Sequence, residues 1–294
     1  MSQRTSATGT QQTRECLLLA AVCDVRGFST LQNHIDEYIV SGLTLDGRGD
    51  EIAKENLNFM ASTRKRAGKI FRDSLLRLGQ DANQLKYALK STGDGFLVAV
   101  EIMLLEGVNW NRKKYPKHWA PRAWALANAL MSLYEDSKRS RDRASLGGMT
   151  SRFLRKFGKE LGLAKKDYQK RGLFRVPGAL AMGSGTITRA IESVRDNREG
   201  NRGDAYGHPV NVSFRLCDHA GRFNEETEEI SPEVLLDRRV GRLLTSEKPP
   251  VDGWVVEPLD RVALKGMEET WCYALRKKKK TRSRRLSAKT RKAK

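Results

Sequence analysis

Cysteine is scarce in this sequence, and its spacing argues against a fold held together by disulfides or by zinc. The four cysteines among 294 residues, Cys16, Cys23, Cys217 and Cys272, form no CxxC pair. The first two lie in an apolar run that is typical of a buried strand. We therefore predict reduced, buried thiols and a cytoplasmic location, rather than a disulfide framework or a zinc site.

Long apolar segments are also absent. No run approaches the roughly 18 uncharged apolar residues of a transmembrane helix, so none is predicted. Residues 1–15 are polar and lack the apolar core of a signal peptide, so we expect a disordered lead-in. No internal repeat is visible, and the 39% of hydrophobic residues is enough for a packed core.

Positive charge is abundant but unevenly distributed. The net charge is +20, yet the tail from Arg276 holds 12 lysines and arginines and no acid, and residues 138–175 hold 13 against three acids. These segments carry the whole excess, so the rest of the chain is close to neutral. We expect the basic insertion (about 138–172) and the basic tail (277–294) to be solvated or flexible. Such segments contact RNA, DNA or anionic lipid weakly and with strong salt dependence.

Hydrophobic periodicity predicts a mixture of strands and helices. Residues 16–25 have the pattern of a central buried strand, and Ser29 is the expected N-cap of a helix that runs to about Tyr38. An Asp-Gly turn predicts a hairpin over 84–101. Other helices are expected at 51–79, at 118–136 and from Pro209, and other strands at 173–188, with a bend, and at 254–275. Since no single βα unit repeats, we predict an α+β fold, α/β only in the loose sense.

Two acidic residues stand at the ends of predicted strands. Asp24 ends the buried strand, and Asp94 lies at the tip of the hairpin. A strand end and a hairpin tip can be neighbours in one antiparallel sheet. Two carboxylates there can hold two divalent metals, which clamp the attacking and leaving oxygens of a phosphoryl displacement. A strand-end aspartate taken alone is more often a cap.

A polar pair follows further along the chain. Asn211 and Arg215 are four residues apart, so a helix would place both on one face, where an amide and a guanidinium suit ribose and phosphate oxygens. Such a pair is more often an ordinary surface feature. Lys90, four residues before Asp94, would by itself be a solvated strand end. The joint occurrence of these residues in this order gives them weight.

Four segments that carry these residues resemble, in order, the catalytic domain of the class III nucleotide cyclases, the family of adenylate and guanylate cyclases. They are CDVRGFSTL, KSTGDGFLVAVE, GDAYGHPVNVSFRLCDHA and LKGMEETWCYAL. The resemblance covers about residues 16–276. It implies a βαββαβ ferredoxin-like sheet core with insertions, which works as a head-to-tail homodimer with shared active sites. The implied reaction converts a nucleoside triphosphate to a 3′,5′-cyclic nucleotide and pyrophosphate.

The resemblance also implies the roles of single residues in the phosphate half of the site. Asp24 and Asp94 would bind two divalent metal ions, Mn²⁺ or Mg²⁺, and the carbonyl of Val25 would help. The backbone around Gly27 and Phe28 would approach the triphosphate.

The other half of the site is implied in the same way. Asn211 and Arg215, both supplied by the partner chain, would orient the ribose and stabilise the pentacoordinate phosphorus. Lys90 and Asp204 fall at the two positions that read the base. This explains a lysine on the hairpin that carries the metal-binding Asp94, because the base is read beside the phosphates.

The sequence departs from the family pattern in several places. Phe214 stands where a small residue is usual, and Pro177 interrupts a segment that is normally a smooth strand. The gaps from Asp24 to Lys90 and from Asp94 to FRVPGALAMG are longer than usual. These departures indicate a divergent member, so the base preference does not follow from the resemblance.

Hydrogen-bond type leaves the base open. Lys90 and Asp204 fit adenine or cytosine, and also uracil or guanine with the two contacts swapped. We expect no appended sensor, receptor or membrane domain, and with its insertions the chain looks like the bacterial pyrimidine cyclases of Pycsar anti-phage defence. We therefore expect cUMP or cCMP as the product, ahead of cAMP from an adenylate cyclase. A catalytically inactive nucleotide-binding or polyanion-binding protein is disfavoured, because the expected site residues are present and the body is near neutral.

Overall fold

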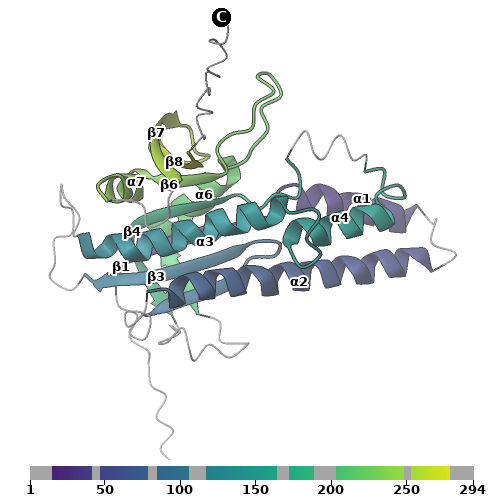
Figure 1. The fold of residues 1–294 in the computed structure, drawn as a ribbon, viewed down its shortest axis with the longest axis horizontal. Helices are drawn as coiled ribbons and strands as arrows, with labels where there is room; N and C mark the ends of the chain where they lie inside the picture. Colours follow the sequence, from purple (N-terminus) through teal and green to yellow (C-terminus); the bar gives the residue numbers. More distant parts are fainter. Residues whose placement is uncertain are drawn as a thin grey trace, which may run out of the picture.

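A single mixed β-sheet forms the centre of the computed structural model, with helices on both faces (Figure 1). The structure describes residues 15–41, 47–78, 85–105, 117–163, 172–188, 203–247 and 253–278. Almost all of the predicted lead-in and basic tail, and residues 164–171 of the basic insertion, lie outside these ranges.

The predicted helices and strands occur in the expected order. In chain order the described elements are β1 (Glu15–Cys23), α1 (Phe28–Val40), α2 (Arg48–Leu76), β2 (Tyr87–Ser91), β3 (Phe96–Leu104), the 3₁₀ turn η2 (Lys117–Trp119), α3 (Ala120–Lys138), α4 (Leu146–Phe157), β4 (Gly178–Thr188), β5 (Asp204–Gly207), α6 (His208–His219), β6 (Val234–Asp237), α7 (Arg238–Thr245), β7 (Trp254–Val262) and β8 (Thr270–Lys277). The structure thus adds α4, β5, β6 and α7, which the sequence analysis does not predict.

The sheet order is β2-β3-β1-β4-β6-β8-β7, and β5 pairs with β4. Strands β1 to β4 pair with one another only in antiparallel fashion, with helices between β1 and β2 and between β3 and β4. This order is that of a βαββαβ ferredoxin-like core, so the predicted α+β fold is confirmed. Strand β6 then joins β4 in parallel, and β8 and β7 extend the edge. The dimer stays a prediction, since the structure holds one chain.

Strand β1 is buried on both faces, which explains its uninterrupted apolar sequence. Leu17 and Leu19 face the cluster that includes residues of α1 to α4, whereas Leu18 and Ala20 face the cluster beneath α6. Figure 1 shows α3 running along the sheet with α2 and α4 beside it. All four cysteines are buried and unpaired, as the sequence predicts.

The start of α1 differs from the expectation. Ser29 is not the N-cap; it lies inside the helix, and Gly27 occupies the cap position with a φ of 78°. Glycine adopts this left-handed conformation without the steric penalty that a side chain brings. The backbone of the preceding loop therefore decides where the helix begins.

The predicted bend between two strands over 173–188 is also wrong. Residues 178–188 form one continuous strand, β4, and Pro177 comes just before it. Proline has no N–H to donate to a sheet, but its carbonyl accepts a hydrogen bond from the Asp24 N–H at 3.3 Å. Pro177 thus ends the connection to β4 and supports the loop after β1.

The basic insertion is more ordered than expected. Residues 146–157 form α4, whose Phe153, Leu154 and Phe157 are buried, because apolar residues repeat at helical spacing. Asp136, only 3% exposed, accepts hydrogen bonds from Arg66 of α2 at 2.7 and 3.1 Å and from a backbone N–H of α4 at 3.0 Å. This carboxylate joins α2, α3 and α4.

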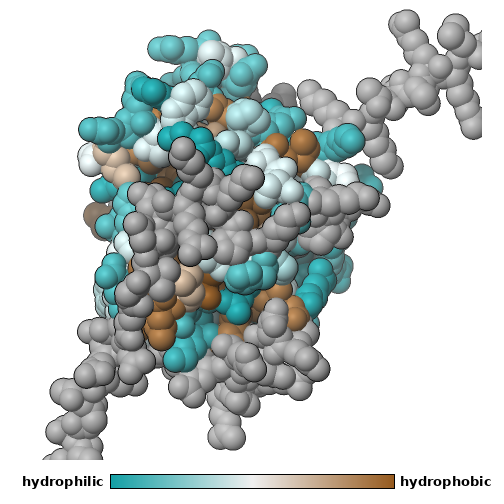
Figure 2. Space-filling model, turned by 90° about the vertical axis from the view of Figure 1, so that its left-hand side faces the viewer, coloured by the Kyte–Doolittle hydropathy of each residue, from teal (hydrophilic) through white to brown (hydrophobic). Residues whose placement is uncertain are grey.

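The surface is mixed in character. Figure 2 shows hydrophobic and hydrophilic groups interspersed on one face of the molecule. Among the described helices, none has both the length and the apolar character that crossing a membrane requires.

Candidate active site

Asp24 and Asp94 meet at one end of the sheet. Cys23, the last residue of β1, pairs with Phe96, the first residue of β3, so the loop after β1 lies against the tip of the β2–β3 hairpin. Both aspartates are half-buried. Burial, together with the charge of Asp94 and a hydrogen bond to it, raises the pKa of Asp24 to about 7. The structure therefore brings the two predicted carboxylates into direct contact.

Two glycines make this approach possible. Gly93 supplies the positive φ of 88° that turns the hairpin, and the Thr92 N–H donates to the Gly95 carbonyl at 3.0 Å. A Cβ on Gly95 would lie 2.5 Å from the Cys23 carbonyl oxygen and 3.0 Å from Asp24 Oδ1. Only a residue without a side chain lets the hairpin tip touch the end of β1.

The carboxylate pair fits hard divalent cations. Two acidic groups in contact repel each other when both are ionised, and cations with oxygen ligands remove that repulsion. Asp24 and Asp94 would hold such ions, with backbone carbonyls and water as further ligands. Among the described residues, no cluster of three or more His, Cys, Asp or Glu side chains suited to a metal occurs. Asp24 and Asp94 are therefore the two side chains that we assign as metal ligands.

The loop between β1 and α1 is held in place by the segment before β4. Arg26 N–H donates to the Arg175 carbonyl at 2.8 Å, and the Phe174 N–H donates to the Arg26 carbonyl at 2.6 Å. The side chains of Val25 and Phe28 are buried, and the Val25 carbonyl accepts from the Phe28 N–H at 3.2 Å. Gly27 then starts α1, whose first N–H groups have no partner within the helix.

Lys90 and Asp204 lie side by side although 114 residues separate them. Lys90 Nζ donates to Asp204 Oδ2 at 2.7 Å, and the Tyr206 hydroxyl donates to the same oxygen at 2.7 Å. Burial alone would raise the pKa of Asp204, but hydrogen bonds from Lys90 and Tyr206 outweigh it and lower that pKa. The hydrogen bond to Asp204 raises the pKa of Lys90. The predicted base-reading pair thus forms one charged cluster.

Tyr206 is a member of this cluster that the sequence reasoning missed. Asp204 and Tyr206 both lie on β5 and are two residues apart. Alternate residues of a strand point to the same face. A strand prediction over 204–207 would supply the signal, but the sequence analysis predicts no strand there.

Asn211 and Arg215 both lie on α6, as predicted. Asn211 is exposed and Arg215 is half-buried. In the described part of the chain, no hydrogen bond or ion pair joins either residue to Asp24 or Asp94. One chain therefore brings together the carboxylate pair and the Lys90–Asp204 pair, but not all the expected site residues.

Arg26 is a second residue that the sequence reasoning missed. Its Nη2 donates to the backbone carbonyls of Cys217 at 3.0 Å and Asp218 at 3.1 Å, and also to that of Ala220. These carbonyls belong to the C-terminal end of α6, where cations are favoured. Arg26 thus fastens the loop that carries Asp24 to the helix that carries Arg215.

Comparisons with known proteins give structural neighbours only. No family model matches the chain, and no curated protein sequence matches it. Solved structures that resemble it include the adenylyl cyclase CyaB from P. aeruginosa, at 13% identity and a TM-score of 0.38, covering 92% of this chain and 98% of that one. A bacterial light-regulated adenylyl cyclase has 12% identity and a TM-score of 0.44, covering 92% of this chain and 55% of that one.

A third neighbour is the catalytic core of a rhodopsin-guanylyl cyclase with converted specificity, in complex with ATPαS. Its identity is 14% and its TM-score 0.42, with 91% of this chain and 99% of that chain covered. These neighbours are adenylyl and guanylyl cyclase catalytic domains. Because the likeness is weak, the proposals below rest on the residues of the site.

Proposed function

We propose that this chain is a nucleotidyl cyclase, which converts a nucleoside triphosphate to a 3′,5′-cyclic nucleotide and pyrophosphate. The Asp24–Asp94 pair carries the proposal: two carboxylates touch where adjoining strands end, and α1 begins four residues after Asp24. Two carboxylates suit two hard cations, and a helix N-terminus suits phosphate. Together they suit a metal-bound triphosphate.

The reaction is an in-line displacement at the α-phosphorus. The ribose 3′-hydroxyl loses its proton to solvent, its oxygen bonds to the phosphorus, the bond to the α–β bridging oxygen breaks, and pyrophosphate leaves with that oxygen. Divalent metals held by Asp24 and Asp94 would lower the pKa of the 3′-hydroxyl and neutralise the triphosphate. Asn211 hydrogen-bonds the ribose and holds the hydroxyl in line. Arg215 donates to the phosphoryl oxygens on which charge develops.

A head-to-tail homodimer would complete the site. Asn211 and Arg215 have no hydrogen bond or ion pair to the carboxylate pair among the described residues, and a second chain would supply them. Mixing Asp94→Asn chains with Arg215→Ala chains should then restore activity, to roughly a quarter of normal, since half the dimers regain one of two sites. Failure to complement, with heterodimers verified, would place the whole site in one chain.

The base is proposed to be a pyrimidine. A base must replace the bonds that Lys90 and Tyr206 make to Asp204, so it enters beside a tyrosine ring. Phe214, half-buried next to Arg215, packs against the apolar cluster beneath α6, and in the proposed homodimer it would be a second bulky group near the site. Both favour a smaller ring, while the hydrogen-bond pattern itself also fits adenine. A role in anti-phage defence, which the resemblance implies, stays a prediction.

Product analysis tests the proposal directly. The full chain is incubated with equal ATP, GTP, CTP and UTP and with Mn²⁺, and the products are resolved by mass spectrometry. A dominant cUMP or cCMP is expected, and a dominant cAMP would identify an adenylate cyclase. Absence of every cyclic product would refute the cyclase. Asp94→Asn should abolish turnover, whereas Asp218→Asn, which changes an exposed acid of α6, is the matched control.

A further inference from the structure

The basic insertion builds a second hollow, which neither Asp24 nor Asp94 lines. It has a volume of about 770 Å³, is open to solvent on one side, and is bordered by the end of α3, the turn that follows, one face of α4 and residues 173–175. No acid is among the described residues that line it. Six cations do so: Lys138, Arg141, Arg143, Arg152, Arg155 and Arg175.

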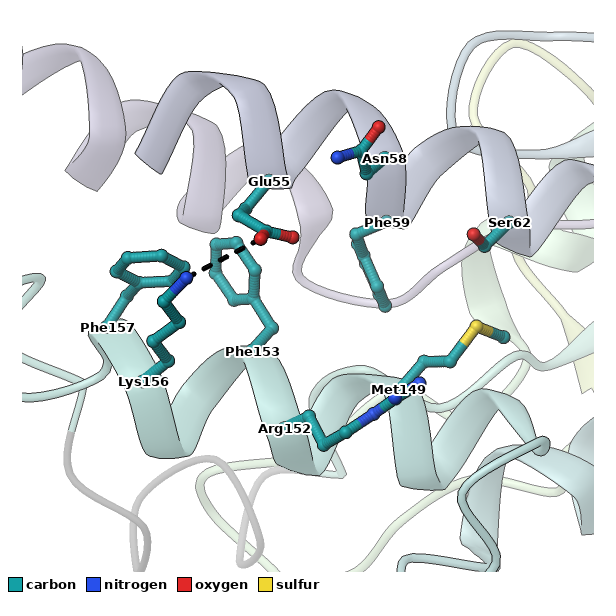
Figure 3. Close-up of a pocket in the computed structure, with 9 residues that line it drawn as sticks. All are labelled: Glu55, Asn58, Phe59, Ser62, Met149, Arg152, Phe153, Lys156 and Phe157. Carbon is teal, nitrogen blue, oxygen red and sulfur yellow. Dashed lines mark hydrogen bonds and ion pairs between the residues drawn. The ribbon is translucent and has the colours of Figure 1, made fainter. Parts of the chain in front are cut away.

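Helix α4 directs its side chains to two different environments. Figure 3 shows the residues that line a second pocket, between α2 and α4. This pocket is smaller, at about 280 Å³, and in it the rings of Phe153 and of Phe59 of α2 have their centroids 5.9 Å apart. Lys156 pairs with Glu55 at 3.5 Å there. Arg155, a neighbour in sequence, lines the larger hollow instead. The helix thus pairs Lys156 with Glu51 and Glu55, whereas Arg155 lines the hollow and Arg152 lines both spaces.

Most of the charge around the hollow is not neutralised. In the described part of the chain, the guanidinium groups of Arg141, Arg143 and Arg155 have no hydrogen-bond or ion-pair partner. Lys138 pairs with an acid, Glu135, at 3.4 Å. Arg152 and Arg175 donate to the backbone carbonyls of Arg143 at 3.2 Å and Ser137 at 3.4 Å, which carry no net charge. Like charges around one hollow repel each other, and a bound anion would relieve that repulsion.

Two acids of the insertion, Asp142 and Glu160, bind other groups instead of the cations of the hollow. Asp142 Oδ1 accepts a hydrogen bond from the Ala144 N–H at 3.0 Å, within its own turn. Glu160 pairs with Arg48 of α2 at 2.8 Å. The negative partner for the hollow therefore does not come from these side chains.

We propose that this hollow binds a small ligand with two or more linked phosphates, either a free polyphosphate or a nucleotide. Guanidinium groups bind phosphate oxygens in a bidentate manner, and several around one hollow match several phosphates. The volume lies within the range of small-molecule sites. Leu154, Leu163 and Phe174 add apolar lining, which suits the organic part of a nucleotide.

The hollow shares a wall with the loop that carries Asp24. Leu173 lines the hollow, and its side chain packs against Gly27, where a Cβ would lie 2.6 Å from Leu173 Cδ2. Arg175 also lines it, and its carbonyl accepts from the Arg26 N–H. A ligand in the hollow would therefore contact the segment that supports the active-site loop. This binding site goes beyond the proposed cyclase activity.

Calorimetric titration of the full chain with inorganic tripolyphosphate tests the site. EDTA is present to exclude metal-dependent binding, and salt is kept at roughly 0.15 M to screen non-specific contacts. We expect saturable binding that Arg141→Ala/Arg155→Ala weakens by at least about tenfold. Arg139→Ala/Lys159→Ala is the matched control. It removes the same charge from the same insertion but leaves the lining intact, so the affinity should change less than about twofold.

The outcomes separate the alternatives without any measurement of turnover, so they stand whether or not the chain is a cyclase. UTP or ATP that binds more tightly than tripolyphosphate, and is equally sensitive to Arg141→Ala/Arg155→Ala, would identify a nucleotide; equal affinity would identify free polyphosphate. No saturable binding, or equal loss in both variant pairs, overturns the proposal. So does tighter binding of single-stranded RNA that both pairs weaken alike, because it indicates a nucleic-acid surface. Thermal unfolding verifies the fold, and Arg141→Gln/Arg155→Gln repeats the test with longer side chains.

Discussion

Replacing Gly95 with alanine is expected to disable the site while leaving most of the fold intact. The new Cβ would lie 2.5 Å from the Cys23 carbonyl oxygen, 2.9 Å from Thr92 Oγ1 and 3.0 Å from Asp24 Oδ1. An ordinary contact begins at 3.4 Å, so the closest approach is 0.9 Å too short. Because the obstacle is backbone of the central strand β1, the hairpin tip must move, and it takes Asp94 away from Asp24.

The size of the effect follows from that displacement. A misplacement of about 1 Å in a catalytic group costs on the order of a hundredfold in rate, or about 2.7 kcal/mol of transition-state stabilisation. Overpacking costs about 1–3 kcal/mol of folding free energy, so the chain should still fold. The assay is kcat with saturating Mn²⁺, and urea denaturation gives the stability.

Gly93→Ala is the matched control for the same hairpin. Gly93 has a φ of 88°, so alanine is strained there by about 1–2 kcal/mol, but nothing lies within 4 Å of its Cβ. Stability should fall while turnover stays within about threefold of normal. The reasoning is refuted if Gly95→Ala keeps normal turnover, or if both variants lose activity equally.

Three further changes test other parts of the structure. Asp136→Ala should lower the free energy of unfolding in urea by about 2–4 kcal/mol, because it leaves Arg66 and a buried N–H of α4 without their acceptor; an unchanged midpoint would contradict this. Tyr206→Phe should change KM several-fold with little change in kcat, since it removes only a hydrogen bond to Asp204; a large fall in kcat alone would argue against base reading. Burial raises the pKa of Asp237 from 3.8 to about 6, so its ionisation disfavours the folded state. Stability should therefore fall, by up to about 3 kcal/mol, as the pH rises from about 4 to 6, and Asp237→Asn should remove that part of the slope.

The secondary structure was predictable wherever one period dominates the sequence. The run before Asp24 is apolar at every position because β1 is buried on both faces, and the Asp-Gly signal placed the hairpin correctly. Helix α3 follows from its apolar spacing, and Pro209 does lie in the first turn of α6. In these segments local pattern and tertiary environment agree.

The errors occur where distant contacts decide the local conformation. The cap of α1 depends on the left-handed Gly27, against which Leu173 packs from far along the chain. Pro177 looked like an interruption, yet it supports the loop after β1. The insertion looked solvated by its charge, but its apolar residues hold α4 against α2 and α3. The many charged residues of this segment made the helical spacing of its apolar residues hard to recognise.

In the site, too, local patterns are predictable from the sequence and distant contacts are not. The sequence indicated that Asp24 and Asp94 come together, because a strand end and a hairpin tip are neighbours in an antiparallel sheet. The direct Lys90–Asp204 bond spans a separation that no local pattern reveals. Arg26 escaped notice for the same reason, since its partners are backbone carbonyls of a helix almost two hundred residues away.

Arg26 leads to a test of how the two sites of the proposed dimer are built. Its guanidinium joins the loop of Asp24 to α6 of the same chain, and in a head-to-tail dimer these two parts serve different active sites. In the heterodimer of Asp94→Asn with Arg215→Ala chains, the one intact site takes its loop from the second chain and its α6 from the first. Arg26→Ala should therefore lower activity severalfold from either chain, because each placement loosens one half of that site. The lost hydrogen bonds come from a charged group and are worth about 1.5–3 kcal/mol each.

Arg122→Ala is the control for that test. Arg122 likewise donates to two backbone carbonyls, those of Glu101 and Ile102 at 3.1 Å, but at the far end of β3 from the hairpin turn. It should reduce stability without the loss of turnover. If Arg26→Ala acts only from the chain that supplies the loop, then the arginine supports Asp24 alone, because a loosened α6 would have slowed the shared site as well.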